Sequence, residues 1–378
     1  MHPTILRIMK ITRIETIPVR VPLKKGMSTK TAHGEHVVTE IVIIRVHTDE
    51  GLVGLGEATV AVRWTGETSQ SCVSLIETIL GPALAGANPL EITRARQAMD
   101  VAAKLNPFTK AGIEMALWDI AGKAAGMPVY QLLGGKVRDS ARIKMVVGAF
   151  DIPRVRSLAQ QFLEWGVTCI KVKTGLIPEE DVARVRAVRE LVGPSFPITI
   201  DSNCGWTVTT AKQTLRKLAD LGVTVAEQPI PPDDPSAMAE VRRDTTIPIM
   251  ADESVFTLND AWQLTTARAC DILSIYPGKH GGIAGTVEIA HVARAAGLKC
   301  AIGSNLELGI GTAAMLHVAA ALPEVDSELC PADLIGPLYH EADLLTEPLS
   351  LGPAVAKVPS GPGLGVELDE AQLERYQS

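Results

Sequence analysis

Three carboxylates hold equivalent positions in this sequence, each directly after a short apolar run. They are Asp201 in ITIDSN, Glu227 in VAEQP and Asp252 in IMADES, roughly 25 residues apart. Mutual repulsion makes three neighbouring anions costly unless a cation lies between them. Because every donor is an oxygen, the expected ion is Mg²⁺, with Mn²⁺ as the alternative. The competing interpretation is that each carboxylate separately caps a helix or pairs with an arginine.

Two lysines lie on the apolar run that precedes the first of these carboxylates. They are Lys171 and Lys173 in TCIKVK. Alternation along a strand turns both side chains to one face and Val172 to the other. Burial of an unpaired ammonium is costly, so lysines inside a barrel indicate function more than packing. A nearby cation favours the neutral amine, which can take a proton from a substrate. The alternative is a solvated pair at a sheet edge.

The elements that would position these residues recur from about residue 140 onward. Strands are expected at 143–149, 168–173, 197–201, 223–227, 247–252, 271–276 and 299–303, with a weaker eighth at 325–329. Starts about 25 residues apart leave room for a strand, a helix and two loops, which favours a closed parallel barrel. Catalytic groups of such barrels lie at the C-terminal ends of the strands, where the three carboxylates stand.

The first third of the chain has a different pattern. Residues 10–22 and 38–47 are rich in β-branched residues and are followed by a turn at 49–51, which predicts an antiparallel meander. Apolar residues then recur at helical spacing over 68–135. Strands followed by helices indicate an α+β unit.

Three segments follow from this division. We expect an α+β capping domain over 1–138, the catalytic barrel over 139–337, and a segment over 338–378 that returns to the capping domain. The last segment is rich in Pro and Gly and ends in polar residues, so we do not expect it to be a separate domain.

Composition excludes several classes of partner. A net charge of −7 without a basic cluster argues against nucleic acid. No apolar run reaches the ~18 residues that span a membrane, and the N-terminus does not read as a signal peptide. The six cysteines show no metal-binding or redox spacing and are expected to be reduced thiols of a cytoplasmic protein.

The order of motifs along the chain, KVK, DSN, EQP, ADES and GKHGG, resembles the muconate-lactonizing subgroup of the enolase superfamily. The segments GLVGLGEAT, ALWDIAGKAAGMPVYQLLGG, DSELCPADLIGPL and VPSGPGLGVELDE extend the resemblance over nearly the whole chain. It implies a capping domain on a modified (β/α)7β TIM barrel, bound Mg²⁺, and proton abstraction next to the carboxylate of a small-molecule substrate. It also implies a homo-oligomer, either a dimer or an octamer.

The same resemblance suggests roles for individual residues. Lys173 resembles the acid/base of the family, and Lys171 resembles the electrostatic partner that also contacts the substrate carboxylate. Substrate contacts are further expected from Asn203, Glu253, Ser304, Asn305 and Glu328. Two N-terminal loops, at about 27–36 and 58–66, are expected to close over the site, with His33, Arg63 and Trp64 as candidate contacts.

One position departs from the family pattern. Members usually carry a second catalytic lysine five residues before the Gly-Gly pair of the sixth strand, and here Tyr276 stands in that place. Lys279 lies nearby and is the other candidate for a catalytic role, while Tyr276 could contact the substrate or only pack. If Lys279 does not reach the site, only one face has a strong base, which disfavours a racemase or epimerase and permits cycloisomerisation or syn-elimination. No His follows the seventh strand, at 301–305.

Our first prediction is therefore muconate cycloisomerase activity. The alternatives are a dehydratase, or a racemase or epimerase of a hydroxy-acid or amino-acid derivative. A non-catalytic, metal-stabilised binding protein is the third alternative, since a fold does not fix a function. The presence of Lys173 with all three carboxylates argues against it, because fold stability requires no lysine in the mouth of a barrel.

Overall fold

A three-stranded antiparallel sheet begins the computed structural model, which describes residues 9–378. Strand β1 (Ile11–Pro22) pairs with β4 (Val38–Thr48), and β4 pairs with β5 (Val53–Ala58). Gly51, with φ of +82°, supplies the left-handed conformation of the turn between β4 and β5. The predicted meander is confirmed. Residues 1–8, which we predicted not to form a signal peptide, lie outside the described residues.

Helices cover one face of this sheet. They are α2 (Ser69–Leu75), the π-helical turn η1 (Ile76–Leu80), α3 (Gly81–Leu84), α4 (Ile92–Ala102) and α5 (Pro107–Ala125). The short helix α6 (Val129–Leu132) follows and packs against α5 and barrel helix α13 (Gly309–Ala321). Helix α5 lies so close to β5 that a Cβ on Gly56 would stand 1.8 Å from the carbonyl oxygen of Gly112. This close approach explains why position 56 in the motif GLVGLGEAT is a glycine, so no phosphate-binding role is needed to account for it.

Two buried carboxylates of α5 join the parts of the molecule. Glu114 accepts from the backbone N–H of Ile283 (2.7 Å), at the start of barrel helix α12 (Ile283–Ala295). Asp119 accepts from Leu55 N–H (2.9 Å) in the sheet and from Leu364 N–H (2.8 Å) near the C-terminus. Helix α5 thus fixes the capping domain against the barrel.

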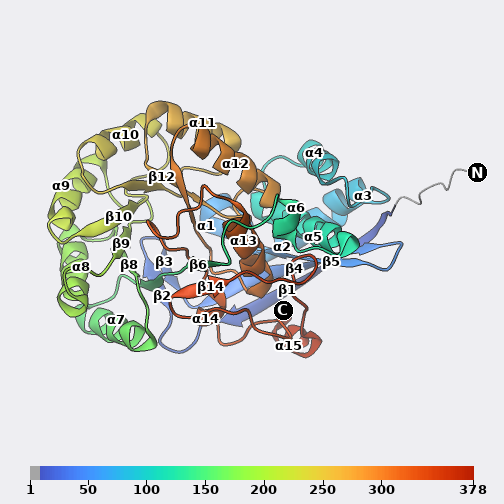
Figure 1. Cartoon of the computed structure of the whole chain (residues 1–378), viewed down its shortest axis with the longest axis horizontal. Helices are drawn as coiled ribbons and strands as arrows, with labels where there is room; N and C mark the ends of the chain where they lie inside the picture. The colour runs from blue at the N-terminus through green and yellow to red at the C-terminus, as the bar shows by residue number, and fades with distance from the viewer. Residues whose placement is uncertain (1–8) are drawn as a thin grey trace, which may run out of the picture.

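Seven parallel strands form the curled sheet of the barrel. In spatial order they are β7 (Met145–Val147), β8 (Ile170–Lys173), β9 (Ile198–Asp201), β10 (Val223–Glu227), β11 (Ile249–Ala251), β12 (Ile272–Ile275) and β13 (Lys299–Ile302). A ring of helices surrounds them (Figure 1): α7 (Ile152–Trp165), α8 (Pro178–Val192), α9 (Val208–Ala219), α10 (Pro235–Arg243), α11 (Leu258–Ala267) and α12. Helix α13 (Gly309–Ala321) lies nearer the capping domain.

The predicted eighth strand at 325–329 is wrong as a strand. That stretch is irregular, and one bridge joins Val325 to Cys300 while another joins Ala332 to Ile143. Pro331 has no N–H for a ladder, which limits regular pairing in this segment. The segment 325–333 still closes the gap between β13 and β7, so the barrel is completed without a regular last strand.

The C-terminal part returns to the capping domain, where the C-terminus lies close to β1 (Figure 1). Helix α14 (Gly336–Tyr339) offers the Tyr339 carbonyl to Lys24 N–H at 2.8 Å. Strand β14 (Val355–Lys357) pairs with β6 (Ser140–Arg142). Helix α15 (Glu370–Tyr376) precedes Ser378, whose N–H donates to the Pro18 carbonyl at 3.0 Å. The segment boundaries near residues 138 and 337 stay a prediction.

Two further observations concern the chain as a whole. Within residues 9–378, no helix has both the length and the apolar character needed to cross a bilayer. The six cysteines are free thiols, and five of them are buried.

His317 on α13 is a buried joint between three segments. Its Nδ1 accepts from Tyr130 N–H (3.2 Å) on α6, and its Nε2 donates to the Leu364 carbonyl (3.1 Å). Burial lowers the pKa of His317 from 6.5 to about 4. The neutral ring therefore holds the C-terminal segment at neutral pH.

The free energy of unfolding should decrease as the pH is lowered from about 6.5 to about 4. In this window His317 binds a proton in the unfolded chain but stays neutral in the folded one. A shift of that size corresponds to about 3 kcal/mol. His317→Gln can keep both hydrogen bonds without titrating, so its urea unfolding free energy should fall less over this window. Burial also lowers the pKa of His340 to about 4, so the variant keeps part of the dependence. Equal pH dependence in both proteins would contradict this account.

Candidate active site

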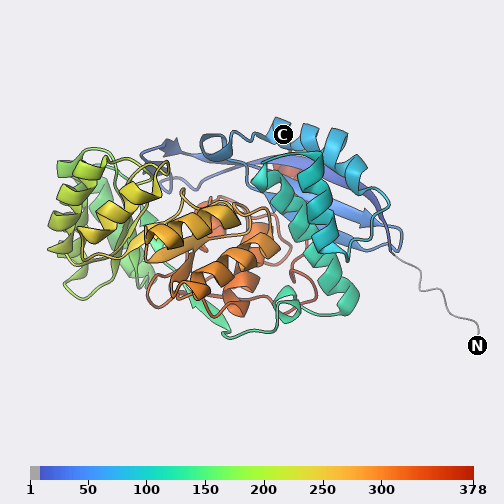
Figure 2. The same cartoon turned by 90° about the horizontal axis from the view of Figure 1, so that it is seen from above.

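A cavity of about 520 Å³ opens where the capping domain meets the C-terminal ends of the barrel strands. Its outer wall is the hairpin of β2 (Thr29–Thr31) and β3 (Gly34–His36), together with the short helix α1 (Val62–Thr65). Figure 2 shows these segments, in blue, extending from the capping domain over one end of the barrel. Both loops that we expected to close over the site thus border the cavity.

The strand register brings the predicted chemical residues together. Lys173 on β8 lies opposite Asp201 on β9, and Asp201 lies opposite Glu227 on β10. Asp252 follows directly after β11, and Lys171 precedes Lys173 on the same face. All five side chains line the cavity, although each residue is at least nine-tenths buried. These five side chains therefore form a recessed polar surface at the bottom of the cavity, which we call the floor.

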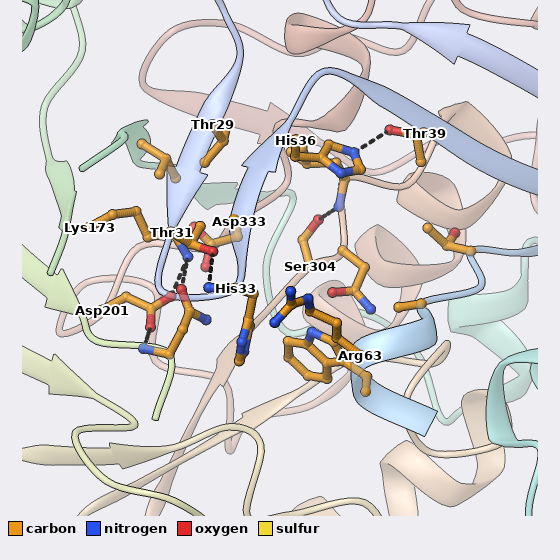
Figure 3. Close-up of a pocket in the computed structure, with 18 of the residues that line it drawn as sticks. Thr29, Thr31, His33, His36, Thr39, Arg63, Lys173, Asp201, Ser304 and Asp333 are labelled. Atoms are coloured by element: carbon orange, nitrogen blue, oxygen red, sulfur yellow. Dashed lines mark hydrogen bonds and ion pairs between the residues drawn. The ribbon is translucent and has the colours of Figure 1, made fainter. Parts of the chain in front are cut away.

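Lys173 is oriented by two neighbours. Its Nζ lies 2.5 Å from Asp201 Oδ2 and 3.0 Å from the side-chain oxygen of Asn203. The amide of Asn203 donates in turn to Glu253 (3.0 Å), whose same oxygen meets His33 of the hairpin at 3.3 Å. The predicted contact residues Asn203 and Glu253 thus link Lys173 to His33 of the capping loop, and Asn203 lines the cavity while Glu253 does not. Figure 3 shows Lys173, Asp201 and His33 around this part of the cavity.

Lys171 has a different environment. Its Nζ lies 2.7 Å from Asp333 Oδ2 and 3.0 Å from Glu227 Oε2. Burial alone would lower the pKa of Lys171, but the charges of Asp333, Glu227 and Asp201 outweigh it and raise the pKa well above its usual range. Lys171 therefore remains an ammonium, which suits binding of an anion and not acceptance of a proton.

The sequence analysis missed two charged residues, Asp333 of the cavity lining and Lys144 behind it. Lys144 is fully buried, donates to the Pro331 carbonyl and lies 3.1 Å from Asp333 Oδ2. Burial would raise the pKa of Asp333, but Lys144 and Lys171 outweigh it and lower the pKa. A charged residue within the apolar run IKMVVGA was the available signal for Lys144, and Asp333 stood in the quoted motif DSELCPADLIGPL.

The two residues expected on the opposite face lie behind the cavity wall. Lys279 is fully buried, and its Nζ bonds Asp252 Oδ1 (2.6 Å), the Asp252 carbonyl (2.8 Å) and the Ser274 carbonyl (3.0 Å). Tyr276 is fully buried too, with its ring 6.5 Å from that of Trp64, which does line the cavity. Burial and the charge of Asp252 raise the pKa of Tyr276 well above 10, so its phenol is neutral.

The placement of Glu328 is corrected by the structure. Its side chain is 76% exposed and bonds Arg142 at 2.9 Å, away from the cavity. The segment is not a regular strand, so strand alternation could not predict which of its side chains faces the cavity. Asp333, and not Glu328, lines the cavity. Ser304 and Asn305 do line the cavity, and Ser304 Oγ donates to Glu307 at 2.5 Å.

Asp201, Glu227 and Asp252 are the residues that could hold a divalent cation. Within residues 9–378, no three His, Cys, Asp or Glu side chains are already grouped as metal ligands, since each of these carboxylates is engaged by a lysine. The donor set nevertheless fits a hard cation, because all donors are carboxylate oxygens at adjacent strand ends. Burial, together with the charges of Asp201 and Asp252, raises the pKa of Glu227 to about 8 against the attraction of Lys171. The part of that shift that comes from Asp201 and Asp252 is negative charge that a bound cation would offset.

A capping domain over a curled parallel barrel, with lysines and carboxylates at the strand ends, defines a class of α/β-barrel enzymes. Residues 10–134 match the family model described as the mandelate racemase/muconate lactonizing enzyme N-terminal domain. Residues 154–372 match the model described as enolase C-terminal domain-like. The chain belongs to the mandelate racemase/muconate lactonizing enzyme family of the enolase superfamily.

Relatives with different activities are equally similar to this chain. An N-succinyl-L-Arg/Lys racemase of Bacillus cereus is 34% identical over 367 residues, covering 97% of each chain. Muconate cycloisomerase 1 of Pseudomonas putida is 34% identical over 376 residues, covering 97% of this chain and 98% of its own. The crystal structure of a 2-chloromuconate cycloisomerase from Rhodococcus opacus 1CP superposes with a TM-score of 0.93 at 33% identity, covering 98% and 100%. Overall similarity therefore leaves the reaction open.

The buried position of Asp333 generates a stability prediction. Asp333→Asn would leave Lys144 buried without its carboxylate, and loss of one partner of a buried ion pair costs about 3–5 kcal/mol. Glu328→Gln, five residues earlier, removes only an exposed pair and should cost at most about 1 kcal/mol. Urea unfolding of both variants measures the difference. Equal unfolding free energies would show that the buried charges do not depend on Asp333.

Proposed function

We propose that this chain is a Mg²⁺-dependent enzyme in which Lys173 removes or delivers a proton next to a substrate carboxylate. Asp201, Glu227 and Asp252 would hold the Mg²⁺. When bound, the ion would supply positive charge against the negative charge that develops on the substrate carboxylate as an enolate forms. The support is the convergence of these groups on one cavity, on a fold whose relatives are isomerases, cycloisomerases and racemases.

Lys171 and Lys173 have different roles in this proposal. Lys171 stays charged because three carboxylates surround it, so it can bind and orient the substrate carboxylate. Lys173 is held through Asp201 and Asn203 at the cavity wall, where its amine can reach a carbon beside that carboxylate. The proposed general base is therefore Lys173.

One observation favours the lactonizing type of reaction. Within residues 9–378, Lys171 and Lys173 are the only lysines that line the cavity, while Lys279 and Tyr276 are sealed behind its wall. Racemisation needs proton transfer on both faces of one carbon, whereas cycloisomerisation needs one group on one face. We therefore propose muconate cycloisomerase-type, one-base chemistry, with Tyr276 serving as part of the wall.

The test uses two substrates of different reaction type. With Mg²⁺ and cis,cis-muconate, the wild-type protein should form a lactone. The loss of diene absorbance and NMR spectra of the product measure this reaction. Lys173→Ala should lower turnover by about 10³-fold, a usual magnitude for loss of a general base. Lys217→Ala, an exposed lysine on α9, is the matched control and should not change the rate.

Stereochemistry decides between the two reaction types. Incubation with N-succinyl-L-lysine in D₂O should give, at most, deuterium at the α-carbon with retained configuration. Racemisation as fast as exchange would overturn the one-base proposal and favour the racemase activity. Absence of both lactone formation and exchange, in the presence of Mg²⁺, would overturn the proposed function itself.

A further inference from the structure

Lys144 is a buried ammonium to which the proposed reaction gives no role. It directly precedes β7 and is fully buried. Its Nζ donates to the Pro331 carbonyl and lies 3.1 Å from Asp333 Oδ2. Burial of an ammonium is costly even when it is paired, and hydrophobic residues often replace buried ion pairs without loss of stability. A lysine at this position therefore indicates a task beyond packing.

Asp333 lies between Lys144 and Lys171. Its oxygen Oδ2 lies 3.1 Å from Lys144 Nζ and 2.7 Å from Lys171 Nζ. The other oxygen, Oδ1, is buried and has no hydrogen-bond partner within residues 9–378. Asp333 and Lys171 line the cavity, whereas Lys144 does not. Lys144 is thus placed to act on a substrate through Asp333 and Lys171, and not by contact.

The charges at the barrel mouth balance only when Lys144 is counted. Four carboxylates lie within ion-pair distance of four lysines: Asp201, Glu227, Asp252 and Asp333 with Lys144, Lys171, Lys173 and Lys279. Without Lys144 the group would carry an excess negative charge, and Asp333 would be paired with Lys171 alone. With Lys144, the divalent cation of the proposed function leaves an excess positive charge, which suits the negative charge that develops on a substrate carboxylate.

Lys144 stays charged, and its charge acts beyond Asp333. Burial would lower the pKa of Lys144, but the charge of Asp333 outweighs burial and raises the pKa, and smaller effects come from Cys330, Lys171 and Glu227. Glu227 is one of the proposed metal ligands. Because charges interact strongly where water is excluded, the ammonium of Lys144 opposes a cation at the metal site and favours an anion at Lys171.

We propose that Lys144 is a positioning residue of the active site, which offsets Asp333 so that the charge of Lys171 remains available to the substrate carboxylate. This inference rests on the proposed function, which places that carboxylate at Lys171. Lys144 then weakens metal binding and stabilises the negative charge that grows on the substrate as the reaction proceeds. An interaction that strengthens toward the transition state affects turnover more than substrate binding.

Metal affinity and turnover should change in opposite directions when the charge is removed. Lys144→Met removes the ammonium, and Lys144→Gln removes it but keeps a donor for the Pro331 carbonyl. In both variants Asp333 keeps Lys171 as a partner, so no carboxylate is left unpaired. Calorimetry with Mg²⁺ alone should show binding about tenfold tighter than in the wild-type protein, because a repulsive unit charge at several ångströms has been removed.

Turnover is measured at saturating Mg²⁺ with the compounds of the proposed function. The kcat for lactone formation from cis,cis-muconate, or for α-deuterium exchange of N-succinyl-L-lysine, should fall by about tenfold in both variants, with a smaller change in KM. Lys217→Met removes the same charge from the exposed face of α9 and should change neither Mg²⁺ affinity nor kcat.

A double variant separates charge from structure. Lys144→Met combined with Asp333→Asn restores the balance of charges, so its Mg²⁺ affinity should return toward the wild-type value. A purely structural role of Lys144 would instead weaken Mg²⁺ binding and lower turnover together. That result, an unchanged Mg²⁺ affinity, or loss of the fold in both single variants by circular dichroism would overturn the assignment.

The metal and turnover readouts keep the two proposals apart. Lactone formation or exchange by the wild-type protein, with no response to either Lys144 variant, would leave the proposed function in place and remove Lys144 from it. Tighter Mg²⁺ binding by both variants, without turnover of either compound by the wild-type protein, would support the electrostatic role of Lys144 and contradict the proposed function.

Discussion

The barrel mouth depends on an array of buried opposite charges. Four buried lysines, of which Lys171 and Lys173 line the cavity while Lys144 and Lys279 lie behind its wall, are each within 4 Å of at least one of four carboxylates. An unpaired buried ion costs several kcal/mol, so no member of such an array can be lost cheaply. The members come from positions all around the barrel: Lys144 before β7, Lys171 and Lys173 on β8, Asp201 on β9, Glu227 on β10, Asp252 after β11, Lys279 after β12, and Asp333 in the closing segment. The array thus also holds shut the side where a regular eighth strand is absent.

The array gives similar side chains different tasks. Lys171 is fixed as a cation by three surrounding carboxylates, whereas Lys173 is shared between one carboxylate and a neutral amide at the cavity wall. Lys279 is tied to Asp252 from behind and never reaches the cavity. The site is therefore asymmetric, because Lys171 and Lys173 line the cavity while Lys279 is buried behind its wall. The capping domain adds the part that faces solvent. There His33 contacts Glu253, and Arg63 makes no ion pair with any residue of 9–378.

The features that the sequence predicted correctly lie on regular strands and helices. Period-two alternation placed Lys171 and Lys173 on one face, and the recurrence of strands placed Asp201, Glu227 and Asp252 at the same end of the barrel. The curled parallel sheet and the antiparallel capping sheet followed from the same patterns. The orientation of side chains on irregular backbone could not be predicted. Asp333 and Glu328 are both acidic and five residues apart, and without a strand period the sequence could not tell which points inward. The depth of Tyr276 was equally hidden, because its ring packs against Trp64 of α1, which is distant in the sequence.

Magnesium calorimetry tests the central claim most directly, because the account requires that Asp201, Glu227 and Asp252 form one cation site within the charged array. Titration of the wild-type protein should give one Mg²⁺ per chain, and Asp201→Asn should abolish or greatly weaken binding while the circular dichroism spectrum stays the same. Asp220→Asn, an exposed carboxylate at the end of α9, should bind as the wild-type protein does. Undiminished Mg²⁺ binding by Asp201→Asn, or no binding by the wild-type protein, would contradict the account.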